Sequence, residues 1–225
     1  MVRDKTVMDN DARPMSGDNS YIYFGNLFPH EPQYRSGRFL GLALTPRFDR
    51  DIAHDARAAL PFDDGSVPGF QSQDVFEHVE REKVPAILDD IYRCLRDGGL
   101  FRLSLPDYNS PLLRRRSAYD HTGRVLYDVA MGGALQAAMA GDVEVSLPPG
   151  GDTHLWFPTF HGLLEVILAS RIRHCEEIHF YHYWRNPEEW VVQPFDQSLM
   201  PVSRVPPADM RAGGKPISLV VDFVK

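Results

Sequence analysis

Residues 55–107 decide the fold, and they read DARAALPFDDGSVPGFQSQDVFEHVEREKVPAILDDIYRCLRDGGLFRLSLPD. Within them, apolar residues recur at helical spacing, which predicts an amphipathic helix over residues 81–95. The apolar positions are Val84, Ile87, Leu88, Ile91 and Leu95. Gly98 and Gly99 are expected to end this helix, and a mostly apolar run follows over residues 100–105. We expect this run and residues 69–73 to form two buried parallel strands, joined by the helix in a right-handed crossover.

Four short motifs follow one another through this stretch. They are LPF at 60–62, FEHV at 76–79, RCLRDGG at 93–99, and a strand that closes with Pro106 and Asp107. In this order they resemble the second half of a class I S-adenosylmethionine-dependent methyltransferase of the small type 11 kind. The resemblance covers about a quarter of the chain, and a series of motifs is more specific than any one of them. It implies an α/β fold: a doubly wound, mostly parallel seven-stranded Rossmann-like sheet with helices on both faces.

Other segments fit the remaining strands of such a sheet. Residues 21–24 form a compact β-prone run suited to the first, central strand. The second and third strands are expected over 39–44 and 51–55, and a helix begins near Thr159. An alternating pattern over 171–184 predicts a further strand, and the proline-rich residues 185–216 are expected to form a long loop. The resemblance makes residues 217–224 an antiparallel last strand beside the fifth.

Composition indicates one soluble domain. The chain has 225 residues, of which 43% are hydrophobic and 24% charged, which suffices for a single core. The polar residues 1–19 predict a mobile tail, and 20–225 form one domain with a variable insertion around 108–158, which the resemblance places over the acceptor site. The start of the chain lacks a secretory signal and no apolar run is long enough to cross a membrane, so we expect a cytoplasmic protein.

Charge and cysteine content argue against several classes of binding partner. The net charge of −7 argues against a nucleic-acid binder and against a protein of anionic membranes. Cys94 and Cys175 have no CxxC spacing, so the sequence predicts no disulfide framework and no zinc cluster. The resemblance to methyltransferases implies a small-molecule acceptor as the partner. A homodimer is the commonest assembly for such a protein, although nothing in the sequence specifies its interface.

The resemblance implies S-adenosylmethionine as the cofactor, and the sequence departs from the family where that cofactor binds. Only Gly25 stands where a motif glycine is expected, and Pro29 and Pro32 leave little room for the following helix. Leu44, Thr45 and Pro46 follow the second strand, where the family has an acidic residue for the ribose. Asp49 or Asp51 is then the substitute that the sequence offers.

Further cofactor contacts are expected at the ends of the third and fourth strands. The resemblance places Asp55, followed by Ala56, near the adenine amino group, although Asp55 is equally suited to cap a turn. Gln73 and Asp74 end the fourth strand, where ligands of open α/β sheets collect.

The sequence offers two catalytic candidates, each with a structural alternative. Asp107 follows the fifth strand, where it would orient the acceptor, or it forms a Pro-Asp turn. His78 would act in acid-base chemistry, although relatives carry the Glu-His pair at a helix start. His174, His179 and His182 do not form a metal site, since residues 179 and 182 point to opposite faces of a strand and no carboxylate-rich motif accompanies them.

Two functions remain open on the sequence alone. The first is S-adenosylmethionine-dependent methyl transfer to a small molecule or sugar-type acceptor, which the retained Asp55, LPF and Glu-His segments favour. The second is a methyltransferase-fold protein that has lost catalysis and serves as a binding or partner subunit, which the altered glycine turn and the missing ribose carboxylate favour. A nicotinamide-dependent dehydrogenase fits less well because no GxGxxG is present.

Overall fold

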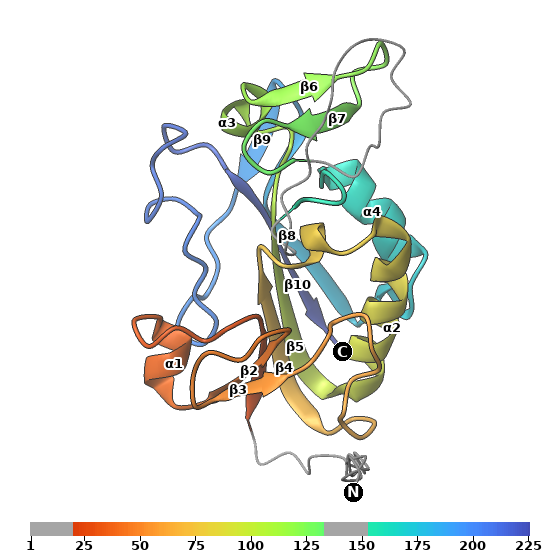
Figure 1. Cartoon of the computed structure of the whole chain (residues 1–225), viewed down its shortest axis with the longest axis vertical. Helices are drawn as coiled ribbons and strands as arrows, with labels where there is room; N and C mark the ends of the chain where they lie inside the picture. The colour runs from red at the N-terminus through yellow and green to blue at the C-terminus, as the bar shows by residue number, and fades with distance from the viewer. Residues whose placement is uncertain (1–19, 133–152) are drawn as a thin grey trace, which may run out of the picture.

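A computed structural model describes residues 20–132 and 153–225. The predicted tail, residues 1–19, lies outside the described residues, as does the part of the insertion from 133 to 152. A central sheet runs through the molecule in the order β3-β2-β1-β4-β5-β10-β8-β9 (Figure 1). Its strands are β1 Tyr21–Phe24, β2 Phe39–Ala43, β3 Asp51–Ala53, β4 Val67–Gln73, β5 Leu95–Pro106, β8 Glu177–Asn186, β9 Glu189–Val192 and β10 Ser218–Val224.

The sheet is doubly wound about β1. Strands β1 to β5 are all parallel, and the chain reverses direction across the sheet between β1 and β4. Strand β10 is antiparallel to both β5 and β8, with Ser218 opposite Pro106 and Val224 opposite Leu100. The mostly parallel sheet and the antiparallel last strand beside the fifth are therefore confirmed.

The strand-helix-strand unit forms as the pattern predicts. After β4, two short 3-10 turns, η1 Phe76–His78 and η2 Arg81–Lys83, lead into α2, Val84–Cys94. The apolar face of α2 buries Val84, Ile87, Leu88 and Ile91 against the sheet. The helix ends at Cys94, four residues before Gly98, and β5 begins at once. Gly98 instead turns the strand at φ 68°, and its amide donates to the Lys225 carbonyl.

The two faces of the sheet are covered differently. Helices α2 and α4, Phe160–Leu168, lie on one face with η3, Arg171–His174, and enclose the main apolar core (Figure 1). Within the part of the chain that the structure describes, the other face carries only the short α1, Pro32–Ser36, and the loop that precedes β10. Proline explains this asymmetry, since Pro29 and Pro32 restrict α1 and further prolines interrupt residues 194–216.

The sheet has eight strands where seven were expected. The additional strand, β9, pairs antiparallel with β8 at the sheet edge, within the segment expected to be a loop. The turn between them is held by Asn186, whose side-chain oxygen accepts from the amides of Glu188 and Glu189. The strand β8 itself starts later than predicted, because residues 171–174 form η3.

The insertion adds a small second sheet beyond the carboxyl end of β5 (Figure 1). Its described elements are α3, Pro111–Arg114, and the antiparallel strands β6, Ser117–Tyr119, and β7, Val125–Asp128. Among the described residues, no helix is long and apolar enough to cross a membrane.

Candidate functional site

A cavity of about 670 Å³ opens where β1, β2 and β4 end. We call it the strand-end cavity. Parallel strands of this topology place ligands at this edge, beside the point where strand order reverses. Six residues that the sequence analysis singled out line this cavity: Gly25, Asp55, Ala56, Gln73, Asp74 and His78. The structure thus brings these residues together, while their individual roles stay predictions.

Gly25 closes β1 in a conformation that favours glycine. Its φ is 110°, and its amide donates to the Leu42 carbonyl at 2.8 Å. A Cβ here would meet Val75 Cγ2 at 3.6 Å, which is ordinary contact, so space alone would admit a small side chain. The backbone conformation is what a substitution would strain.

Asp55 lines the cavity as one half of a local ion pair. Its carboxylate accepts from Arg57 Nε at 2.9 Å and from Arg57 Nη2 at 2.6 Å. These hydrogen bonds lower the Asp55 pKa to about 2, so the group is a carboxylate throughout the physiological range. It can still accept a hydrogen bond from a ligand, because a carboxylate has about four acceptor positions.

Asp74 sits at the end of β4 with a positive φ of 51°. A residue other than glycine rarely adopts this conformation, and such residues collect at functional sites. One carboxylate oxygen accepts from Arg204 at 2.8 Å, while the other is buried without a partner among the described residues. The side-chain oxygen of the neighbouring Gln73 accepts from the Ser203 amide, and its side-chain nitrogen donates to the Tyr23 hydroxyl.

The ribose carboxylate that the family has at the end of the second strand has no counterpart here. Leu44 occupies that place and is 67% exposed. Neither proposed substitute lines the cavity. Asp51 instead accepts from three backbone amides, those of Leu27, Arg47 and Phe48. Asp49 accepts from the Tyr34 hydroxyl.

Glu31 is a cavity-lining carboxylate that the sequence analysis missed. It is half-buried at the start of α1, and one of its oxygens accepts from the Phe28 amide at 3.1 Å. Burial raises its pKa. Glu31 is the only acidic residue between Gly25 and Gly37, so the sequence did contain a signal. The family resemblance places the ribose acid after the second strand, whereas Glu31 follows the first.

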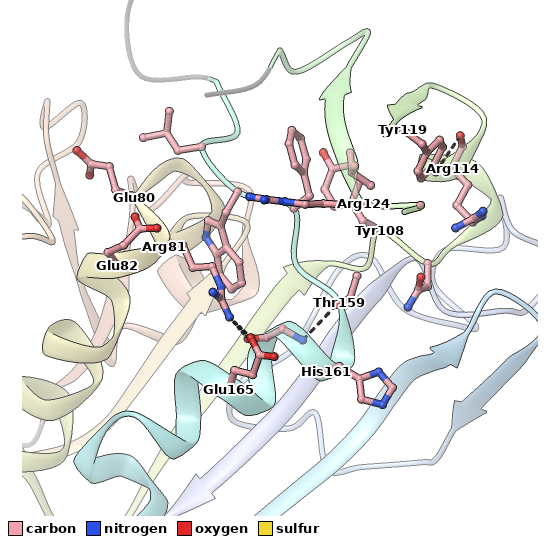
Figure 2. A pocket seen from close by; sticks show the side chains of 17 residues that line it. Glu80, Arg81, Glu82, Tyr108, Arg114, Tyr119, Arg124, Thr159, His161 and Glu165 are labelled. Carbon is pink, nitrogen blue, oxygen red and sulfur yellow. Dashed lines mark hydrogen bonds and ion pairs between the residues drawn. The ribbon is translucent and has the colours of Figure 1, made fainter. Parts of the chain in front are cut away.

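A second cavity, of about 700 Å³, lies between the insertion, the η2 turn and α4 (Figure 2). We call it the insertion cavity. Its walls combine aromatic rings with charged groups of both signs. Arg124 reaches in from the small sheet, and Arg81 pairs with Glu165 of α4 (Figure 2). The aromatic members are Tyr108, Tyr119, Trp156 and Phe157.

The two cavities meet at Leu155, which lines both. Leu155 belongs to the segment through which the chain returns from the insertion. Its amide donates to the Glu77 carbonyl at 2.7 Å, and Trp156 Nε1 donates to the Phe76 carbonyl at 2.7 Å. Hydrogen bonds to the η1 turn thus fix the boundary between the cavities.

Asp107 lies outside both cavities. It is completely buried, and its two carboxylate oxygens accept from the amides of Asn109 and Trp184 at 3.0 and 2.7 Å. Burial raises its pKa to about 7. This arrangement supports the structural alternative, in which Asp107 holds the chain after β5. Its role in orienting an acceptor stays a prediction.

His78 lies beside two other polar groups at the inner end of the strand-end cavity. These are Glu77, which is completely buried, and His154, which is 4% exposed. The ligand atoms of the three side chains lie within 4.8 Å of one another. Burial raises the pKa of Glu77 well above its ordinary value, and burial lowers the pKa of His154 to about 3.

Comparison with known proteins agrees with this architecture. A family model described as "Methyltransferase domain" matches residues 39–103, from β2 through most of β5. An S-adenosylmethionine-dependent methyltransferase from Mesorhizobium loti superimposes with a TM-score of 0.52 at 17% identity, covering 94% of this chain and 93% of that one. One from Archaeoglobus fulgidus gives 0.52 at 10% identity, covering 94% and 88%. No curated protein sequence matches the chain.

This chain has the class I methyltransferase fold. The resemblance that the motifs suggested is thereby confirmed, and the family match supports S-adenosylmethionine as the cofactor. In a methyltransferase fold the cofactor lies across the ends of the strands, which is where the strand-end cavity opens.

The residues of this methyltransferase fold suit such a ligand. Three buried polar atoms in the wall have no hydrogen-bond partner among the described residues: Asn26 Oδ1, His54 Nε2 and Asp74 Oδ1. A buried polar atom costs free energy until it is paired. A ligand that brings amino and hydroxyl groups would pair them, and Glu31 and Asp55 add carboxylate acceptors.

Proposed function

We propose that this chain is an S-adenosylmethionine-dependent methyltransferase whose acceptor binds in the insertion cavity. The observation that carries the proposal is the contact of two cavities at Leu155, one at the strand ends and one under the insertion. A transferase that joins two substrates needs adjoining sites, because holding the reacting groups together supplies much of the rate enhancement.

When bound, S-adenosylmethionine supplies a methyl group on a positively charged sulfur, which passes to an oxygen or nitrogen of the acceptor as that atom loses its proton. The chain's own contribution is positioning. Leu155 separates the cavities, and the hydrogen bonds of Leu155 and Trp156 to the η1 turn keep that boundary in place. Around the acceptor, Glu82 and His161 are exposed titratable groups of the lining that can take the proton.

The lining of the insertion cavity favours a small acceptor of sugar type. Aromatic rings such as Trp156 and Tyr119 pack against the apolar faces of a sugar, while Arg124 and Glu82 can hydrogen-bond its hydroxyl groups. A mixed lining of this kind binds a neutral polyhydroxylated molecule better than it binds a purely apolar molecule.

The first test measures cofactor binding directly. Calorimetric titration of the purified chain with S-adenosylmethionine and S-adenosylhomocysteine is expected to show one saturable site. Gly25→Trp should abolish this binding, because the ring would enter the strand-end cavity and the φ of 110° would be strained. Asp55→Ala should weaken it.

Gly65→Trp is the matched control. Gly65 also has a positive φ, 63°, but nothing lies within 4 Å of its added Cβ, and it does not line the cavity. It should bind both ligands as the unmodified chain does. No heat from either ligand, in protein shown to be folded by circular dichroism, would overturn the enzyme proposal.

A second prediction concerns Glu31, which we propose binds the ribose in place of the missing acid after the second strand. We expect Glu31→Gln to lower the affinity for S-adenosylhomocysteine by about ten- to a hundredfold, because a hydrogen bond to a charged group contributes about 1.5–3 kcal/mol. The change keeps the shape of the side chain and removes its charge. Glu176→Gln, an exposed surface change, is the control. Equal affinity in both variants would show that the ribose is held elsewhere.

The alternative function is a binding or partner subunit without transfer activity. The observation that favours it is Leu44 at the end of β2, where the family has its ribose carboxylate. Under this alternative the titrations with both nucleosides give no heat, and Glu31→Gln changes nothing. The same experiments therefore separate the two functions.

A further inference from the structure

The cluster of Glu77, His78 and His154 has the geometry of a metal site. The Nε2 atoms of both histidines lie near one carboxylate oxygen, Glu77 Oε1, at 3.9 Å from His78 and 3.8 Å from His154. Neither distance is a hydrogen bond. The three side chains thus offer ligand atoms within 4.8 Å of one another, and a small cation placed between them would contact all three after a modest contraction.

The outer nitrogens of both rings are held by oxygen atoms. His78 Nδ1 lies 3.1 Å from the Thr153 carbonyl, which can only accept, so this nitrogen carries the proton. His154 Nδ1 lies 2.6 Å from the Tyr108 hydroxyl, which already donates its hydrogen to Asp128 at 2.7 Å. In the contact between His154 and Tyr108, the proton must therefore come from Nδ1 of the His154 ring.

This proton arrangement prepares both rings as ligands. A neutral imidazole with its proton on Nδ1 has a lone pair on Nε2. In this tautomer the lone pair lies on Nε2, the ring atom that lies 3.9 Å from Glu77 Oε1 in His78 and 3.8 Å in His154. Histidines that bind metals are held in this way, with the second ring nitrogen donating to an oxygen that fixes the ring.

The carboxylate of Glu77 lacks the partner that a buried charge requires. Its exposure is 0%, and neither of its oxygens has a hydrogen-bond partner within residues 20–132 and 153–225. The arginines nearby are already neutralised, since Arg204 pairs with Asp74 and Arg116 with Asp128, both at 2.8 Å. Among the described residues Glu77 is thus a buried acid with neither a hydrogen-bond donor nor an arginine of its own, which is costly unless a cation is supplied.

We propose that Glu77, His78 and His154 bind one divalent transition-metal ion of the zinc class. Two imidazoles and one carboxylate are the donors of open zinc sites, which keep a further position for water or a ligand. Access is from the strand-end cavity, which His78 lines and where its side chain is 23% exposed. This cluster differs from the His174, His179 and His182 set that the sequence displays, and it differs from the expectation of no metal.

The test measures metal binding on untagged, chelator-treated full-length protein. Titration with Zn²⁺ alone should give one equivalent per chain, and titration with Co²⁺ should replace the spectrum of the hydrated ion by stronger visible bands of low-coordinate cobalt. Glu77→Gln and His154→Gln should each lose this site. Tyr108→Phe, which removes only the hydroxyl that holds His154, should weaken binding about ten- to a hundredfold.

His179→Gln is the matched control. His179 is exposed and pairs with Glu177 at 2.8 Å, away from the cluster, so this variant should bind Zn²⁺ as the unmodified chain does. Zn²⁺ should also raise the Tm of the unmodified chain but not that of Glu77→Gln, since an ion that binds only the folded state stabilises it.

Two results would overturn the proposal. One is the absence of stoichiometric Zn²⁺ or Co²⁺ binding by the folded, unmodified chain, which would mean that Glu77 is satisfied by a proton. The other is undiminished binding in both Glu77→Gln and His154→Gln. Should a variant fold poorly, the cobalt spectrum of the unmodified chain decides. None of these measurements depends on methyl transfer, so this proposal and the proposed function fail separately.

Discussion

Arg102→Met is expected to lower the free energy of unfolding by about 3–5 kcal/mol, the usual cost of breaking a buried ion pair by removing one partner. Arg102 lies on β5, 2% exposed, and forms two hydrogen bonds of 2.7 Å to the carboxylate of Asp222 on β10. The same guanidinium donates to the carbonyls of Asp196 and Met200, and it packs 4.6 Å from the centre of the Phe195 ring. Its loss would release the loop from the sheet face that lacks long helices.

Urea denaturation at pH 7 measures this effect, and an exposed ion pair supplies the control. Arg185 and Glu189 form a contact of equal length, 2.7 Å, with both side chains 53% exposed. Arg185→Met should therefore cost less than about 1 kcal/mol. The double variant Arg102→Met/Asp222→Leu should recover part of the loss, because it leaves no buried charge unpaired. Equal losses in the buried and the exposed single variants would contradict the prediction.

Asp107 is expected to make the fold less stable as the pH rises. Its pKa is about 7 in the folded chain, against about 3.9 in an unfolded one. Between these values the folded state holds a proton that the unfolded state has released, so rising pH favours unfolding. The contribution is fully present below pH 4 and is lost by about pH 7, and three pKa units correspond to roughly 4 kcal/mol.

The measurement is the free energy of unfolding between pH 4 and pH 8, with a chelator present throughout. Asp107→Asn should flatten most of the decline, because an amide does not titrate. It should also cost about 1–3 kcal/mol at low pH, since the amide NH₂ would face one of the two backbone donors. Glu77, whose pKa is also raised, leaves a residual slope of the same sign. A full slope retained in Asp107→Asn would show that other groups cause it.

The elements set by local patterns were predictable from the sequence. The helix over 81–95 and the strands β1, β4 and β5 depend on apolar spacing within a few turns of chain, which the sequence displays directly. Strand β9 was missed because four residues beside many prolines carry little periodicity, and only pairing with β8 defines them. The sequence left little room for the family's helix after β1, and α1 indeed has only five residues; Pro32 stands in its first turn, where a helix tolerates proline.

In the candidate site, too, some features could be predicted from the sequence and others could not. Gly25, Asp55 and Asp74 do line one cavity, because strand ends converge in this fold and position along the chain predicts position in space; their roles stay predictions. The meeting of Glu77 with His154 could not be predicted, since it depends on how the insertion folds back onto the η1 turn. For Asp107, the Pro-Asp pair gave no indication that β8 would bury the carboxylate behind Trp184.

The return segment after the insertion has a consequence for how the two ligands influence each other. Three consecutive residues of this segment lie at three different places. His154 belongs to the polar cluster, Leu155 lines both cavities, and Trp156 lines the insertion cavity. A molecule that shifts this short peptide on entering one cavity would change the affinity of the other cavity for its ligand wherever that ligand binds the two positions of the peptide unequally. Thermodynamic linkage makes that influence mutual and equal in size. These three residues would then couple the binding of the two substrates.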